Sequence, residues 1–196
     1  MTDLRAFRFL PCLLVIGLFT LPAFSADMSE VTDPETGLTS WKWHGGQARL
    51  SLSQLLPDQV RAFFQGRGFT AEQSERIAGF CVFQTVVRNE AEADEPLEVD
   101  ITDWRVLRDG MESGTPRTAA SWDTEWQSRD TGQAPRIAFR WALFPTSQTF
   151  APGDWNMGML TLDLPAGETF DLHIGWRRDG QTKNLEMTGI SCAEDR

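Results

Sequence analysis

The sequence predicts a mainly β fold in which two sheets pack as a sandwich and a few short helices lie at the periphery. From Cys81 onward, apolar residues alternate with polar ones or form short runs, and Leu97 and Val99 show the period of two that a half-exposed strand requires. Turn signals such as Asp179-Gly180 separate these runs at short intervals. About seven strands are expected from this pattern.

Two helices are expected ahead of the strands. Pro57 suits the first turn of a helix, and Val60 and Phe64 follow on one face of that helix. Thr70 and Gln73 then have the spacing of a capping box, in which each side chain satisfies a free backbone amide at a helix start. A second helix is therefore predicted from Thr70 to about Gly79, just before the strand that begins at Cys81.

A third short helix is expected between Thr118 and Arg129. Trp122 and Trp126 are four residues apart in this segment, which places both rings on one helix face. We interpret this helix as a lid that packs on the edge of a sheet.

The segments after this helix are predicted as strands. One strand should end at Pro145, because the apolar residues before it fall at every second position and would face the core. These residues are Ile137, Phe139, Trp141 and Leu143. Two further strands, 156–164 and 169–178, are joined by a short turn and are expected to pair as a hairpin.

Together these elements suggest an immunoglobulin-like two-sheet sandwich with two or three short peripheral helices and one disulfide. No repeat, linker or low-complexity block divides the chain, so residues 41–196 are expected to form a single domain. Residues 26–40 are polar and aperiodic, and they are expected to form a flexible N-terminal arm. This fold class implies no antibody-type function.

The segment 1–25 has the pattern of a secretory signal peptide. Arg5 and Arg8 precede an apolar stretch, and Ala23 and Ser25 supply small residues before the expected cleavage point. The apolar stretch is shorter than the ~20 residues that a membrane-spanning helix needs. A periplasmic protein with no stable membrane span after cleavage is therefore expected.

Only two cysteines remain once this segment is removed. In an oxidising compartment such a pair most simply forms a disulfide, so Cys81 and Cys192 are predicted to be bonded to each other. A two-thiolate metal site is the alternative, but the sequence contains no C-x-x-C or H-E-x-x-H motif that would support one.

The composition argues against several classes of protein. The chain has 18 Lys and Arg against 28 Asp and Glu, a formal charge of −10, so it lacks the positive footprint of a nucleic-acid-binding protein. It also lacks a G-x-S-x-G motif, a phosphate-binding glycine loop and a cofactor fingerprint, and it has few histidines to act as a base. A non-catalytic protein is therefore expected.

One candidate site depends on the register of the predicted hairpin. The even-numbered apolar residues of its two strands are expected to face the core, so the odd-numbered residues point outward. A register that pairs Leu164 with Phe170 keeps these faces together. It also places His173 diagonally across from Met159, within reach of a long side chain.

The outward face of this hairpin is predicted to bind a metal ion. Met157, Met159 and His173 are soft or borderline uncharged ligands that suit Cu(I) better than Zn(II), Ca(II) or Mg(II). Trp155 is a candidate aromatic cap for the ion, and His44 is a candidate extra ligand. The alternative is that both methionines are ordinary packing residues covered by the third helix.

This patch resembles the site of periplasmic copper(I) metallochaperones of resistance-efflux systems, in which a Trp caps a Met, Met and His set. Those proteins have W-x-x-M-x-M, whereas this chain has Trp155-x-Met157-x-Met159, and the resemblance is confined to the patch. It implies a copper-chaperone-like role, with a protein partner or a metal donor or acceptor in the periplasm.

The expected function is that of an exported accessory or binding protein, with copper(I) handling as its most specific form. A carbohydrate- or protein-binding sandwich module without a metal is the alternative, because exposed aromatic rings on a sandwich can stack on sugars. The sequence does not distinguish these ligands.

Overall fold

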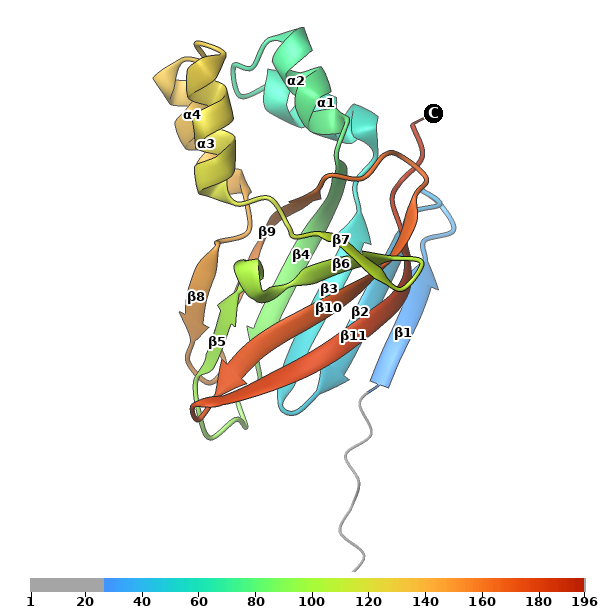
Figure 1. Cartoon of the computed structure of the whole chain (residues 1–196), viewed down its shortest axis with the longest axis vertical. Helices are drawn as coiled ribbons and strands as arrows, with labels where there is room; N and C mark the ends of the chain where they lie inside the picture. Colours follow the sequence, from blue (N-terminus) through green and yellow to red (C-terminus); the bar gives the residue numbers. More distant parts are fainter. Residues whose placement is uncertain (1–26, 196) are drawn as a thin grey trace, which may run out of the picture.

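The computed structural model describes residues 27–195, which form two facing β-sheets with a group of helices at one end (Figure 1). The predicted signal peptide, residues 1–25, lies outside the described residues and stays a prediction. Among the described helices, none is long and apolar enough to cross a membrane. Strand residues outnumber helical residues, 44% against 24%, which confirms the mainly β class.

Sheet A contains five antiparallel strands in the order β1-β2-β3-β4-β9. The first four follow one another along the chain, and β9 returns beside β4 to form an edge. The strands are β1 (Asp27–Thr32), β2 (Thr39–Gly45), β3 (Ala48–Gln54), β4 (Cys81–Asn89) and β9 (Trp155–Leu162).

Sheet B is built around β10, which pairs with β11 along one side and with both β5 and β6 along the other. Strand β8 extends the sheet beyond β5, and β7 extends it beyond β6. The strands are β5 (Leu97–Asp100), β6 (Arg105–Arg108), β7 (Met111–Gly114), β8 (Ser147–Phe150), β10 (Thr169–Arg178) and β11 (Gln181–Ser191).

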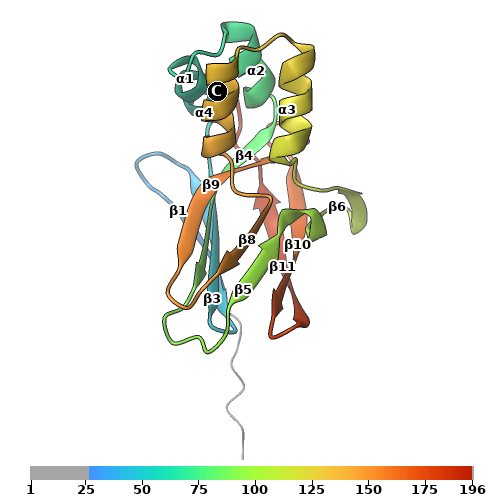
Figure 2. The same cartoon turned by 90° about the vertical axis from the view of Figure 1, so that its left-hand side faces the viewer.

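Four α-helices gather at one end of the sandwich (Figure 2). The capping box at Thr70 is present as predicted, since the Thr70 hydroxyl accepts a hydrogen bond from the Gln73 amide at 3.2 Å. The helices are α1 (Pro57–Gln65), α2 (Ala71–Ala78), α3 (Ala119–Ser128) and α4 (Gln133–Ala142). A short 3-10 helix, η1 (Ile101–Asp103), links β5 to β6.

The first hydrophobic core lies between the sheets. The even-numbered apolar residues of β9 and β10 contribute to it, as predicted, and Leu162 and Leu172 are fully buried. The predicted disulfide between Cys81 and Cys192 is also present in this core and joins residues 111 positions apart. A loop of this length corresponds to about 4–5 kcal/mol in the chain-entropy model of disulfide stabilisation.

A second core lies beneath the helices, on the outer face of sheet A. Trp122 and Trp126 of α3 stack at 5.1 Å, and they pack with phenylalanines from the other helices. Val82 of β4 and Met159 of β9 supply the contact with the sheet. Because β9 is an edge strand, the interpretation of α3 as a lid on a sheet edge is confirmed.

The strand predicted before Pro145 is wrong, because most of that segment forms α4. Within residues 137–143 the buried side chains are Phe139 in α4 and Leu143 at its C-cap, which are four positions apart, the spacing of one helix face. The short alternation of apolar residues fits either a strand or a helix over so few positions. Burial against the second core decides in favour of the helix.

The predicted hairpin of strands 156–164 and 169–178 is also wrong. Both strands exist, but β9 pairs with β4 in sheet A and β10 pairs with β11 in sheet B. The alternation of apolar residues predicts which face of a strand is buried, and this prediction is confirmed for both strands. It does not determine which sheet the strand joins.

Three further differences concern the ends and counts of elements. Strand β1 occupies part of the segment expected to be an arm, and all six of its residues are exposed. The described residues contain eleven strands and four α-helices, more than the seven and the two or three expected. The two antiparallel sheets and the disulfide are confirmed, whereas an immunoglobulin-like identity is not.

Candidate functional site

A groove of about 350 Å³ lies where the helices overhang the outer face of sheet A. Strands β4 and β9 form its floor, and α1 and α4 form its walls. We call it the Trp141 groove, and its lining residues are Leu55, Phe63, Gln84, Trp141, Ala142, Met157, Gly158 and Met159. Its volume falls at the lower end of the ~300–1,000 Å³ range of ligand-binding clefts.

Trp141 is the most exposed large apolar side chain of the described residues, at 84%. It lies two positions after Phe139 on α4, about 200° around the helix axis. Because Phe139 is buried in the second core, the helix turns Trp141 outward. An indole that is open to water beside an apolar groove is typical of a binding surface.

The two methionines form the floor of the groove. Met159 packs partly against the second core, as the packing alternative predicted, but Met157 is 46% exposed and is not covered. The side-chain amide of Gln84, on the neighbouring strand, points toward the thioether sulfur of Met157. Gln84 is the only polar side chain among the lining residues.

Trp155 continues the apolar surface along the outward face of β9. Its side chain is 53% exposed, and the Arg88 guanidinium lies 5.7 Å from its ring centroid. These two residues are direct partners in the pairing of β4 with β9. A cation–π contact at an exposed position of this kind contributes about 0.5–1 kcal/mol.

The structure does not bring His173 to the methionines. His173 lies on the outward face of β10 in sheet B, where its Nε2 is 3.0 Å from Glu186 Oε1. Met157 lies on the outward face of sheet A. The two side chains therefore point away from opposite sides of the sandwich, whose sheets are ~10 Å apart.

His44 is on the same outer face as the methionines but at a distance from them. It lies on β2, which is separated from β9 by β3 and β4, so its backbone is about 14 Å away at ~4.8 Å per strand. Its Nε2 lies 3.9 Å from Glu90 Oε1. Of the predicted ligands, only Met157 and Met159 are brought together, with Trp155 beside them.

A cluster of arginines around one carboxylate joins α2 to α3. The Glu125 carboxylate on α3 pairs with Arg76 of α2, with Arg117 before α3 and with Arg129 after it. Burial alone would raise the pKa of Glu125, but the hydrogen bonds from Arg76 and Arg117 lower it to about 2. This carboxylate is therefore ionised at neutral pH and ties the α2–α3 unit together.

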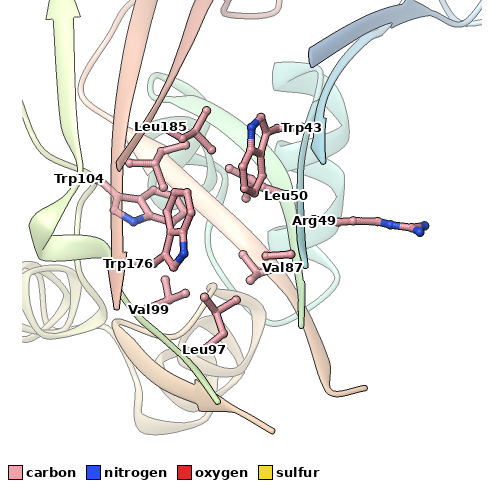
Figure 3. Close-up of a pocket in the computed structure, with 11 residues that line it drawn as sticks. Trp43, Arg49, Leu50, Val87, Leu97, Val99, Trp104, Trp176 and Leu185 are labelled. Atoms are coloured by element: carbon pink, nitrogen blue, oxygen red, sulfur yellow. The ribbon is translucent and has the colours of Figure 1, made fainter. Parts of the chain in front are cut away.

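A second cavity opens between the two sheets, away from the helices, and Figure 3 shows its apolar lining. Trp43 and Trp176 come from opposite sheets, and their ring centroids are 5.1 Å apart. Arg49 points away from the cavity (Figure 3). The volume of this second cavity is about 20 Å³, which is room for roughly one water. We therefore interpret it as a packing gap between the sheets.

Sequence reasoning missed the two walls of the groove. The alternation before Pro145 predicts that Trp141 faces a core, and the sequence around Phe63 predicts only a helix. The spacing of Phe139 and Leu143 would have identified α4 and placed Trp141 on the opposite side. No local signal places α1 opposite α4, because these helices are far apart in the sequence.

No protein-family model, characterised protein or solved structure matches this chain. The chemistry of the Trp141 groove is therefore the basis for the functional proposal.

Proposed function

We propose that this is an exported, non-catalytic binding protein that holds an apolar side chain of a protein partner in the Trp141 groove. The observation that supports this most directly is the 84% exposure of Trp141 at the rim of an apolar cleft. Burial of an indole on binding is strongly favourable, and tryptophans often dominate the energetics of protein interfaces. The disulfide favours export, since such bonds persist in oxidising compartments.

The lining favours a protein partner over a sugar. A carbohydrate-binding site combines an aromatic side chain, on which the sugar stacks, with several hydrogen-bonding groups. Among the lining side chains of the groove, only the Gln84 amide is of that polar kind. Methionines such as Met157 and Met159 instead give an adaptable apolar surface, which suits side chains of varied shape. The groove volume is enough for one or two large side chains.

Peptide selection tests this function. The purified protein is used as bait for a phage-displayed library of random dodecapeptides, and enriched sequences are synthesised with a fluorescent label. We expect Trp141→Ala and Met157→Gln to weaken binding at least tenfold, about 1.4 kcal/mol, because each removes apolar contact in the groove.

Two variants serve as matched controls. Met111→Gln changes an exposed methionine on β7, far from the groove, and Ile137→Ala changes an exposed residue of α4 outside the lining. Both should bind the selected peptides as the unaltered protein does. If no sequence is enriched over the Trp141→Ala bait, the groove is not a peptide-binding site and the proposal is wrong.

Copper(I) binding is a second candidate, favoured by one observation. Met157 and Met159 are successive outward-facing residues of β9, and Trp155 is the outward-facing residue before them on the same strand. His173 is removed from the proposed ligand set, so two thioethers are the ligands this face offers. Among the described residues, no group of three or more His, Cys, Asp or Glu side chains is placed to bind a metal.

A further inference from the structure

We propose that the outer face of sheet A, next to the Trp141 groove, binds an acidic stretch of the same protein partner. This inference rests on the proposed function and specifies the chemistry of the partner. The ligand is then a segment with an apolar side chain in the groove and carboxylates on the neighbouring strands.

Strand register defines the face. One row runs His44, Arg49, Arg88 and Trp155, because each residue is the direct partner of the next across β2, β3, β4 and β9. The adjacent row runs Lys42, Ser51, Val86 and Met157. The partners on the inward side of these strands, such as Leu50 and Val87, are in the core. Both rows therefore face outward, and they lead from β2 directly to the floor of the groove.

Cations outnumber carboxylates on this face, although the chain as a whole is acidic. The carboxylates of this face are Asp27, the partner of His44 in the register of β1 and β2, and Glu90. The protein has a formal charge of −10, yet Lys42, Arg49 and Arg88 lie together on these two rows. Arg49 pairs with Glu90. Within the described residues, no carboxylate oxygen lies within 4.0 Å of the side-chain nitrogens of Lys42 or Arg88. The guanidinium of Arg88 lies instead over the ring of Trp155.

These cations complement an acidic ligand. Asp and Glu are repelled by the acidic surface elsewhere and attracted to this face, so a partner segment is guided toward the groove as well as held beside it. The arrangement is continuous with the groove, since Arg88 and Met157 are on neighbouring strands.

Strand spacing predicts the sequence of the ligand. Counted from Met157 on β9, Arg88 lies one strand away and Lys42 three strands away, about 5 and 14 Å at ~4.8 Å per strand. An extended chain advances ~3.4 Å per residue. Carboxylates are therefore expected within two residues of the apolar anchor and again about four residues from it.

The selection described for the proposed function also tests this inference. We expect peptides recovered with the unaltered protein to contain Asp or Glu at these distances from a Trp, Phe, Leu or Met. For these peptides, Lys42→Gln combined with Arg88→Gln should weaken binding about threefold to tenfold, because two exposed charge pairs are lost. The loss should shrink between low salt and 0.5 M salt, where exposed charges are screened.

The matched control removes two cations from the other sheet. Arg177→Gln combined with Lys183→Gln changes the net charge equally on sheet B, and it should leave binding unchanged. Equal losses in the two double variants would indicate a general charge effect and overturn the inference. Enriched peptides without acidic residues would also overturn it, while leaving the groove function intact.

The two proposals therefore fail separately. Loss of binding in Trp141→Ala with no acidic preference supports the groove alone, whereas no enrichment over the Trp141→Ala bait contradicts the groove itself. Phosphatidylglycerol vesicles provide one more arm. Vesicle binding that depends on Lys42 and Arg88, without any acidic preference among peptides, would replace the acidic segment by a lipid surface.

Discussion

Trp122 of α3 donates a hydrogen bond from its indole Nε1 to the hydroxyl oxygen of Thr161 on β9, at 2.8 Å. Both residues are almost completely buried, with exposed fractions of 0% and 1%. The bond fixes the helices to the edge strand that forms the floor of the Trp141 groove. A polar contact inside an aromatic cluster therefore joins the helical group to sheet A.

Replacing the Thr161 hydroxyl should destabilise the protein. Thr161→Val keeps the shape of the side chain but leaves the buried indole N–H without an acceptor, which costs about 1–3 kcal/mol. The free energy of unfolding, measured with urea, checks this. Thr161→Ser retains the acceptor and should be closer to the unaltered protein, whereas a larger loss in Thr161→Ser than in Thr161→Val would show that methyl packing, not the bond, is responsible.

Gly158 should not tolerate a side chain. An added Cβ would lie 2.3 Å from the Phe144 backbone nitrogen, and this nitrogen donates a hydrogen bond to the carbonyl of Met159 at 2.9 Å. Gly158→Ala must push the 143–144 segment away from β9, so we expect a loss of about 1–3 kcal/mol or more and a lower Tm. Gly175→Ala is the control, because its Cβ would meet nothing closer than 3.5 Å.

Acid should weaken the attachment of α3 through Glu125. Its pKa is about 2 in the folded protein, below the ordinary 4.5, so its contribution is present above pH ~4.5 and is lost as the pH falls toward 2. The shift corresponds to at most about 3 kcal/mol. In urea unfolding at pH 7 and pH 3, Glu125→Gln should lose less stability between the two pH values than the unaltered protein. An identical loss would contradict the depressed pKa.

Copper(I) binding can be tested without disturbing the fold. Changing Met157 and Met159 to Leu conserves apolar volume, so stability should change by less than ~1.5 kcal/mol. If the two thioethers hold Cu(I), this double variant should lose at least tenfold in affinity, measured by competition with a chelator while Trp fluorescence is followed. His173→Ala should now have no effect, because His173 lies on the other sheet. Unchanged Cu(I) uptake in the double variant would end the copper proposal.

The candidate site was only partly predictable. The outward direction of Met157 follows from the alternation of β9, and the structure confirms it. The pairing of Met159 with His173 does not follow, because the short segment between β9 and β10 passes from one sheet to the other. The alternation of a strand specifies its buried face but contains no information about its neighbours.

The sequence by itself determined the local features: the starts of α1 and α2, the residues of β9 and β10 that face the core, and the bond between Cys81 and Cys192. These depend on backbone caps, side-chain periodicity and the number of cysteines, which are all read over short stretches. Only the tertiary structure decided that β9 joins β4, that the segment around Phe139 is a helix, and that Trp141 and Met157 line the same groove. Each of these follows from burial of apolar surface between segments far apart in the chain, and short-range patterns do not encode that choice.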